Sequence, residues 1–310
     1  MTWRALSHRG RAAEGPIVDV EFMYTRRCQQ FTETTRRGPT TATTVEDVDA
    51  HWIDLDGAAN TRDLGGLPAE HGSVRRNRLI RSDNLQQLTP GDIRRLVDEH
   101  DLRAVADLRT QTEVDLEGPG PLTHEPRVSV VHLSLFPEAG ERTDVVAAEE
   151  EGPPVLPWQN RDDKRKDRRG AADVYLRYLD DRPDSIVAAL RLIAHTDGAT
   201  IVHCAAGKDR TGVVVALALD EVGVDRDAIV DDYVRTGDRL EQLLARLKAS
   251  RTYADDVQRV PDEQHKPRPE TMQKFLAGLD ELHGGTSRWL RGHGWTDADA
   301  AGLRAALLAE

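Results

Sequence analysis

The sequence predicts an α/β fold in which a parallel central sheet is flanked by helices and followed by a helical C-terminal part. From about His51 onward, short and almost continuously apolar segments alternate with longer amphipathic segments. Continuous apolar character is typical of strands that are buried on both faces. Strand–helix alternation favours parallel strands, because each helix returns the chain to the same end of the sheet.

The elements are expected in the following order. Strands are expected at 78–81, 104–108, 128–135 and 200–203. One helix begins at Thr89-Pro90, where an N-cap residue precedes proline at the first helical position. Further helical patterns cover 172–181, 183–195, 209–222, 226–235, 238–250, 270–282 and 297–308. No good strand candidate lies in the C-terminal third, so we expect that part to be helical.

We assign the predicted domain to residues 48–310. Residues 1–47, outside this domain, and residues 137–171, within it, differ in composition from the rest of the chain. Residues 1–47 are rich in Arg and Thr and have no apolar period, so a disordered extension is expected there. Residues 137–171 combine an acidic cluster, prolines and a basic run without obvious structure. Long segments of this kind are usually functional or disordered. A solvated linker and a mobile flap over the site, with Trp158 as its apolar contact, are both open interpretations.

Charge and composition exclude several classes of protein. With 42 Lys and Arg against 54 Asp and Glu, the formal net charge is −12, which argues against nucleic acid or an anionic membrane as the main partner. The longest apolar run, 213–219, is far shorter than the ~20 residues that span a bilayer, and no secretory signal is visible. The two cysteines, Cys28 and Cys204, are too few for a disulfide framework or a structural zinc site. We therefore expect a cytoplasmic protein without a structural zinc site that does not associate stably with membranes.

The segment TIVHCAAGKDRTGVVVALALDEVGV, residues 200–224, passes from an apolar strand through a glycine-containing loop to an apolar helix. A tight loop entering a helix presents successive backbone N–H groups to an anion, supported by the helix dipole. Cys204 lies at the mouth of that loop, where positive potential favours the thiolate nucleophile. Arg210 can offer a planar fork to two phosphate oxygens. Gly207 lets the loop turn, and Thr211 is placed to donate to the thiolate.

These residues carry a resemblance to a known family. His203 and Cys204, followed after five residues by Arg210, form the signature of the cysteine-dependent tyrosine phosphatases, and HCAAGKDRTG (203–212) resembles the bacterial tyrosine-phosphatase-like branch. Five more stretches are similar to that branch in the same order: ANTRDLGGL (59–67), LIRSDNLQQLT (79–89), VADLRTQTE (105–113), AIVDDYVRT (228–236) and GGTSRWLRGHGWT (284–296). The resemblance covers about residues 50–308.

The resemblance implies a two-step hydrolysis of phosphate monoesters that needs no metal or cofactor. Cys204 attacks phosphorus and forms a cysteinyl-phosphate, which water then hydrolyses. Arg210 and the loop amides hold the phosphate oxygens through the transition state. The substrate-binding residues of the loop are then Ala205, Ala206, Gly207, Lys208 and Thr211, with His203 as a possible supporting residue. Lys208 would add positive charge towards the substrate.

The identity of the general acid stays open at this point. Asp209 is the family-like candidate, and its alternative role is that of a carboxylate satisfying the free amides of the helix N-terminus. Asp107 is the rival acid, although an ion pair or turn contact with Arg109 is the favoured role for it. Cys28 is expected to take no part in catalysis.

Residues 60–66 read as a turn that the resemblance brings near the active site. Asn60, Arg62 and Asp63 therefore either shape the pocket or, as we favour, support its structure. Tyr175 and Tyr178, three residues apart on a predicted helix, either pack or line the substrate entrance.

The sequence leads to one main function and several alternatives. A protein-tyrosine phosphatase acting on a phosphorylated protein is the main hypothesis. A phosphatase for a small phosphate ester (a nucleotide, a sugar phosphate or a phosphoinositide) is the alternative, because the sequence does not reveal pocket depth. A phosphate-binding module without catalysis is disfavoured because a pure binder needs no reactive thiol. A redox protein that uses Cys204 alone is disfavoured because no resolving cysteine is near and Arg210 would be unexplained.

Overall fold

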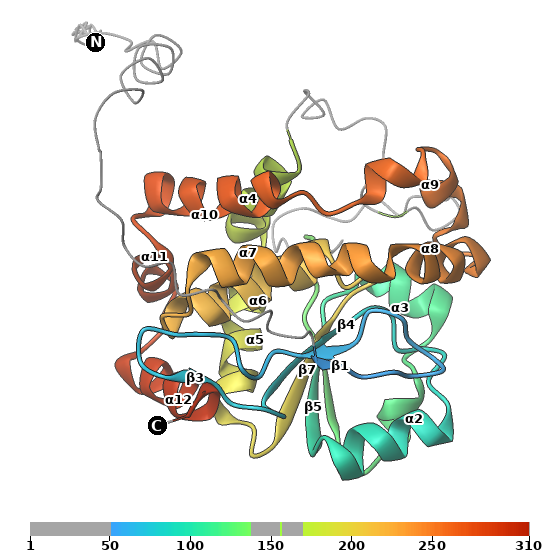
Figure 1. Ribbon diagram of the computed structural model, residues 1–310, viewed down its shortest axis with the longest axis horizontal. Coiled ribbons are helices and arrows are strands. Elements are labelled where there is room, and N and C mark those ends of the chain that lie inside the picture. Colours follow the sequence, from blue (N-terminus) through green and yellow to red (C-terminus); the bar gives the residue numbers. More distant parts are fainter. Residues whose placement is uncertain (1–50, 138–155, 157–169, 310) are drawn as a thin grey trace, which may run out of the picture. The chain divides into compact units, whose positions relative to one another are not determined.

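The computed structural model describes residues 51–137, 156 and 170–309. Its main feature is a six-stranded sheet with the strand order β1-β2-β4-β7-β5-β6 (Figure 1). The strand bounds are His51–Trp52 for β1, Arg62–Asp63 for β2, Leu79–Ser82 for β4, Leu102–Asp107 for β5, Ser129–His132 for β6 and Ala199–His203 for β7. Strands β4, β7, β5 and β6 are parallel, whereas β1 and β2 join one edge antiparallel. The predicted sheet of mostly parallel strands is confirmed.

Two expectations about the strands are wrong. Burial on both faces fails at β6, where Ser129 and His132 are exposed, because this outermost strand has a neighbour on one side only. The C-terminal third also contains a strand, β8 (Leu308–Ala309), which pairs antiparallel with β3 (Ser73–Val74). Two residues are too few to show the period of two that predicts a strand.

Helices make up most of the remaining described chain. Their bounds are Pro90–Arg94 for α2, Gln111–Glu117 for α3, Ala171–Asp181 for α4, Pro183–His195 for α5, Asp209–Glu221 for α6, Arg226–Arg235 for α7, Leu240–Ala249 for α8, Ala254–Gln258 for α9, Pro269–His283 for α10, Thr286–Gly292 for α11 and Asp297–Leu307 for α12. The expected cap of α2 is present, since Thr89 accepts from the backbone N–H of Asp92. The sequence analysis missed α3, α9 and α11, which have seven residues or fewer and therefore show little helical period.

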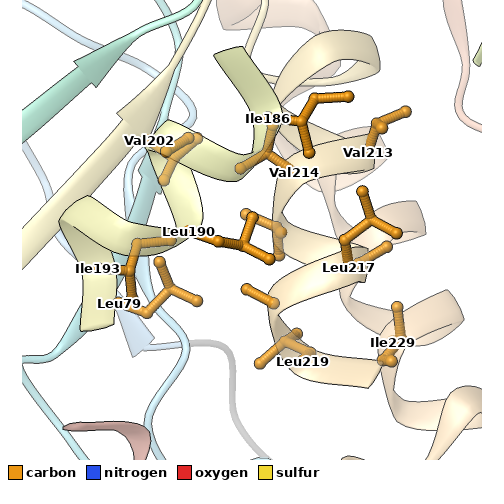
Figure 2. Close-up of a cluster of buried hydrophobic side chains, with 14 of the residues drawn as sticks. Leu79, Ile186, Leu190, Ile193, Val202, Val213, Val214, Leu217, Leu219 and Ile229 are labelled. Atoms are coloured by element: carbon orange, nitrogen blue, oxygen red, sulfur yellow. The ribbon is translucent and has the colours of Figure 1, made fainter. Parts of the chain in front are cut away.

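Two hydrophobic clusters cover the two faces of the sheet. Because successive side chains of a strand point to opposite faces, Leu79 and Val202 join one cluster while Ile80 and Ile201 join the other. The larger cluster packs α5 and α6 against the sheet. Figure 2 shows side chains of both helices meeting there, among them Ile186, Leu190, Ile193, Val213, Val214 and Leu217. All residues of α6 from Arg210 to Leu219 are buried, so the helix that begins at the candidate site is anchored in the core.

The sheet register brings the ends of four strands level. Ser82 at the end of β4 and Asp107 at the end of β5 both lie opposite His203, the last residue of β7. His132 at the end of β6 lies opposite Asp107. In open α/β sheets, ligands bind outside the carboxyl ends of the strands. Residues 204–208 connect β7 to α6 at this edge.

Several predictions fall outside the described residues. They include the extension 1–47, Cys28, Trp158 and all of the candidate flap except Pro137, Leu156, Gly170 and Ala171, and they stay predictions. Residues Asp47–Glu310 form one compact unit. Among the residues that the structure describes, no helix is long and apolar enough to cross a membrane. The cytoplasmic location stays a prediction.

Candidate active site

The 204–208 loop between β7 and α6 turns its carbonyl groups outward. Three consecutive carbonyl oxygens accept hydrogen bonds from outside the loop: Ala205 from Asn84 N at 3.1 Å, Ala206 from Asn60 Nδ2 at 2.9 Å and Gly207 from Arg81 Nη2 at 2.7 Å. The Lys208 carbonyl accepts from the backbone N–H of Gly212 at 2.9 Å. These contacts fix the loop from behind.

The backbone N–H groups of the same loop are left for a ligand. From Ala205 to Asp209, none donates to an acceptor among the described residues. Gly207 makes this geometry possible, because its φ is +66° and a Cβ there would lie 2.4 Å from the carbonyl oxygen of Ser82. Consecutive free amides at the N-terminus of a long helix form an anion-binding cradle.

Cys204 begins the loop and is only 2% exposed. The Thr211 hydroxyl, in the first turn of α6, donates to its Sγ at 3.3 Å. A hydrogen bond donated to the sulfur stabilises negative charge on it. The thiol thus stands at the start of the loop with a donor on its sulfur.

Arg210 is bound by the carboxylate of Glu113, a residue that the sequence analysis did not single out. Its Nη1 and Nη2 donate to Glu113 Oε2 and Oε1 at 2.5 and 2.9 Å, and both side chains are buried. Tyr253 adds a hydrogen bond from its hydroxyl to Glu113 Oε1 at 3.0 Å. Burial alone would raise the pKa of Glu113, but Arg210 and the hydrogen bonds hold that pKa below its usual value. The carboxylate therefore stays charged and fixes the plane of the guanidinium.

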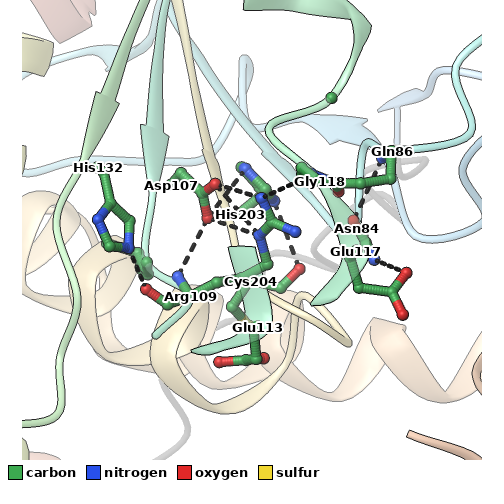
Figure 3. Close-up of polar contacts among 12 residues, drawn as sticks. Asn84, Gln86, Asp107, Arg109, Glu113, Glu117, Gly118, His132, His203 and Cys204 are labelled. Atoms are coloured by element: carbon green, nitrogen blue, oxygen red, sulfur yellow. Dashed lines mark hydrogen bonds and ion pairs between the residues drawn. The ribbon is translucent and has the colours of Figure 1, made fainter. Parts of the chain in front are cut away.

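A second buried pair joins Asp107 and Arg109 (Figure 3). Arg109 Nε and Nη2 donate to the Asp107 oxygens at 2.9 and 2.6 Å. Burial alone would raise the pKa of Asp107, but His203 and Arg109 outweigh it, so that pKa is lowered. Burial lowers the pKa of His203 to about 4, and its Nε2 lies 3.4 Å from Asp107 Oδ1. Asp107 is thus an ionised partner of Arg109, which argues against its role as a proton donor.

Asp209 is the first residue of α6, and its side chain is 39% exposed. Its Oδ1 accepts from the Tyr175 hydroxyl at 2.5 Å and lies 3.8 Å from Lys208 Nζ. No backbone N–H of the described residues donates to it, so the alternative that Asp209 satisfies helix amides does not hold. Lys208 itself donates to the carbonyl of His265 at 3.1 Å, which orients the ammonium towards residues 262–265.

Comparisons with known proteins agree with this geometry. The family model described as "Tyrosine phosphatase family" matches residues 53–309. The chain is 31% identical to the triple specificity protein phosphatase PtpB of Mycobacterium tuberculosis, over 82% of this chain and 98% of that protein. It is 26% identical to a tyrosine-protein phosphatase of Nostoc commune, over 84% of this chain and 83% of that one. The chain belongs to the tyrosine phosphatase family. It is a cysteine-dependent phosphoric monoester hydrolase, as the resemblance implied.

Two solved structures give weaker likenesses. The Siw14 catalytic core aligns with a TM-score of 0.32 and 11% identity, over 74% of this chain and 98% of that one. P. aeruginosa TpbA aligns with a TM-score of 0.31 and 16% identity, over 69% of this chain and 92% of that one.

A buried charge cluster supports the loop of this tyrosine phosphatase from the antiparallel edge. Asp232 on α7 accepts from Arg62 Nε at 2.8 Å and from Arg81 Nη1 at 2.5 Å, and all three side chains are buried. Arg62 Nη1 also donates to the Asn60 side-chain oxygen at 2.5 Å. Burial alone would raise the pKa of Asp232, but the two arginines lower it. Arg62 therefore acts on the Ala206 carbonyl through Asn60, and Asp232 links it to Arg81, which binds the Gly207 carbonyl.

The other residue named in that turn has a structural contact. Asp63 accepts from the backbone N–H groups of Gly65 and Asn77 at 3.1 and 2.9 Å. These bonds fix the turn after β2, and no contact of Asp63 with the 204–208 loop exists among the described residues.

The sequence analysis missed several residues that hold the site together. They are Arg81, Asn84, Glu113, Asp232 and Tyr253. A usable signal existed for Arg81, since a charged residue in a strand expected to be buried on both faces needs a partner. Glu113 also had one, because Thr110 and Glu113 form a capping box at α3 and mark a fixed carboxylate.

Proposed function

We propose that this chain is a protein-tyrosine phosphatase that works through a cysteinyl-phosphate on Cys204. The observation that supports this most is the combination at one loop of a buried thiol, five free amides and a gripped Arg210. In this proposal the amides and the guanidinium bind the three equatorial phosphoryl oxygens while the sulfur attacks phosphorus. The charge that a metal would supply in other phosphatases comes here from Arg210 and the α6 N-terminus, so we propose a metal-independent reaction.

The proposed reaction has two steps, and the same side chain donates a proton in the first and accepts one in the second. Cys204 Sγ attacks phosphorus, the phosphorus–oxygen ester bond breaks, and the leaving oxygen takes a proton from an acid. Water then attacks phosphorus, the sulfur–phosphorus bond breaks, and the same group takes the proton of the water. Thr211, which donates to Sγ, stabilises the sulfur as the leaving group of the second step.

Asp209 is the group we propose as this acid and base. It adjoins the loop, and its carboxyl group is partly exposed. Asp107, the rival, is buried and both of its oxygens accept hydrogen bonds from Arg109, so it is not open to an incoming substrate. The roles of Lys208, Ala205 and Ala206 in binding substrate oxygens belong to the same proposal.

Substrate class is the part of the proposal that needs an experiment. The two relatives are called tyrosine-protein phosphatase and triple specificity protein phosphatase, which supports a phosphoprotein substrate. We would measure phosphate release in the presence of a chelator from a phosphotyrosine peptide, a phosphoserine peptide, a phosphoinositide and several nucleoside monophosphates. Cys204→Ser, which keeps the loop amides and Arg210, is the blank.

Each outcome of this panel favours one of the three candidate functions. Chelator-resistant release that is fastest from the phosphotyrosine peptide supports the proposal. Faster release from a nucleotide or phosphoinositide would replace it with a small-molecule phosphatase. No release above the Cys204→Ser blank would overturn the assignment of Cys204 and favour a phosphate-binding module.

A further inference from the structure

The Asp209 carboxyl group is held by one oxygen and free at the other. Tyr175 on α4 donates to Oδ1 at 2.5 Å, and Lys208 Nζ lies 3.8 Å from the same oxygen. Oδ2 has no partner among the described residues. The tyrosine is 1% exposed whereas the aspartate side chain is 39% exposed. A buried donor therefore anchors one side of an otherwise accessible carboxyl group.

The direction of the hydrogen bonds behind Asp209 follows from counting protons. The Tyr175 hydroxyl has one proton, which it gives to Asp209, so the 2.9 Å contact with Tyr233 on α7 has Tyr233 as the donor. Burial raises the pKa of each tyrosine well above the usual value, and the negative charge of Asp209 raises it further. Both phenols keep their protons, and the chain runs from Tyr233 through Tyr175 to Asp209.

Packing fixes the two rings. The Tyr175 ring stands edge-on to those of Tyr233 and Phe275, with centroids 6.3 and 6.1 Å apart, and is stacked on Tyr178 at 6.3 Å. A Cβ at Gly212, one turn after Asp209, would lie 3.2 Å from the Tyr233 ring. Glycine at this position therefore lets Tyr233 approach α6. The donor has little freedom to leave Asp209.

We propose that Tyr175 is a positioning residue that orients Asp209 for proton transfer, with Tyr233 orienting Tyr175. This inference rests on the proposed function, in which Asp209 is the acid. When the proton passes from Oδ2 to the leaving oxygen, the carboxyl group becomes negative and its bond from the Tyr175 hydroxyl strengthens. The same bond holds the carboxylate in place until it accepts the proton of the attacking water.

The test uses the dependence of turnover on the leaving group. An acid matters most when the leaving oxygen is strongly basic, as in phenyl phosphate, and least for nitrophenyl phosphate. Tyr175→Phe keeps the packed ring and removes the hydroxyl. We expect kcat/KM on phenyl phosphate, which reports the first step alone, to fall about tenfold, the size of one hydrogen bond to a charged group, with little change in kcat/KM on nitrophenyl phosphate. Tyr233→Phe is expected to give the same pattern with a smaller loss.

The matched control is Tyr253→Phe, which also removes one buried hydroxyl from the site. Tyr253 contacts Glu113, the partner of Arg210, and Arg210 binds phosphate whatever the leaving group. Loss of the Tyr253 hydroxyl is therefore expected to lower kcat/KM on both substrates equally. Tyr175→Phe combined with Asp209→Asn is expected to lose no more than Asp209→Asn alone, because one residue acts through the other.

The outcomes separate this inference from the function on which it rests. If Asp209→Asn shows the leaving-group dependence and Tyr175→Phe does not, the positioning role is overturned while Asp209 remains the acid. Equal losses on both substrates in Tyr175→Phe, or additive losses in the double variant, would make Tyr175 a packing residue. If Asp209→Asn itself shows no dependence, the assignment of the acid fails, and the inference fails with it.

Discussion

Two buried arginine–carboxylate pairs lie near the carboxyl ends of the parallel strands, and they differ in the segments of the chain that they connect. Arg109 and Asp107 are two residues apart, so their pair closes within one short stretch at the end of β5. Arg210 and Glu113 are 97 residues apart, and their pair ties the start of α6 to the start of α3. The first pair shapes its own segment. The second determines the orientation of the group that binds phosphate.

The difference shows that burial and pairing alone do not mark a functional arginine. Both guanidinium groups are buried, and each is bound through two nitrogens to one carboxylate. Only Arg210 follows the free amides of the 204–208 loop directly. Breaking either pair is expected to lower stability, but only the second is expected to lower the activity of the folded protein strongly.

Replacing the arginines gives the largest expected contrast. Arg210→Lys should lower kcat/KM at least ~10²-fold, as the loss of an oxyanion donor does, because lysine cannot present a planar fork. Arg109→Lys should mainly lower the free energy of unfolding. Kinetics on nitrophenyl phosphate, corrected for the folded fraction, measure the two effects. Equal activity losses in the two variants would erase the distinction.

Replacing the carboxylates sharpens the same comparison. Glu113→Gln and Asp107→Asn each leave a buried arginine without its charged partner, so each should lower the free energy of unfolding by about 3 kcal/mol. Glu113→Gln should in addition weaken the binding of vanadate, a phosphate analogue, because Arg210 loses its orientation. Urea unfolding and vanadate inhibition constants test both statements. Normal vanadate affinity in Glu113→Gln would show that Arg210 does not need its partner.

His203, which lies beside the Asp107–Arg109 pair, should make the free energy of unfolding depend on pH. Burial lowers the pKa of His203 from 6.5 to about 4 in the folded state, despite the opposing charge of Asp107. Between these values the unfolded chain binds more protons than the folded one, so stability falls as pH decreases. From pH 6.5 to 5 the loss amounts to up to about 2 kcal/mol, at about 1.4 kcal/mol per pH unit.

His203→Gln removes this titration and should flatten the slope of stability against pH in that window. His100, whose pKa is also lowered, titrates in both proteins and cancels in the comparison. Urea unfolding at several values between pH 5 and pH 8 gives the two slopes. An unchanged slope in the variant would mean that His203 is not the titrating group.

Sequence reasoning was strongest where neighbours along the chain decide the structure. Helices α5 and α7 have the predicted bounds, because their periodic patterns are long and their ends carry proline, an N-cap aspartate and basic residues. The contact of Thr211 with Cys204 spans a single loop and the first turn of a helix. The Asp107–Arg109 pair was predicted for the same reason.

It was weakest where the partner is distant in the sequence. The sequence does not predict Glu113 or Tyr253 as site residues, since 97 residues separate Glu113 from Arg210 and 140 residues separate it from Tyr253. The sequence leaves two roles open for Asp209, general acid or helix-capping carboxylate, because nothing in it indicates that Tyr175 contacts this residue. The antiparallel edge strands β1 and β2 were not predicted, because a strand of two residues is too short to show an alternating pattern.

By itself, the sequence determined the family, the mostly parallel sheet and the residues of the 204–208 loop, because local periodicity and one compact motif encode them. The tertiary structure alone decided which carboxylate grips Arg210, which donors hold the loop carbonyls and which tyrosine contacts Asp209. The physical reason is that a buried charge or polar group requires a partner, yet any segment that the fold brings near can supply it.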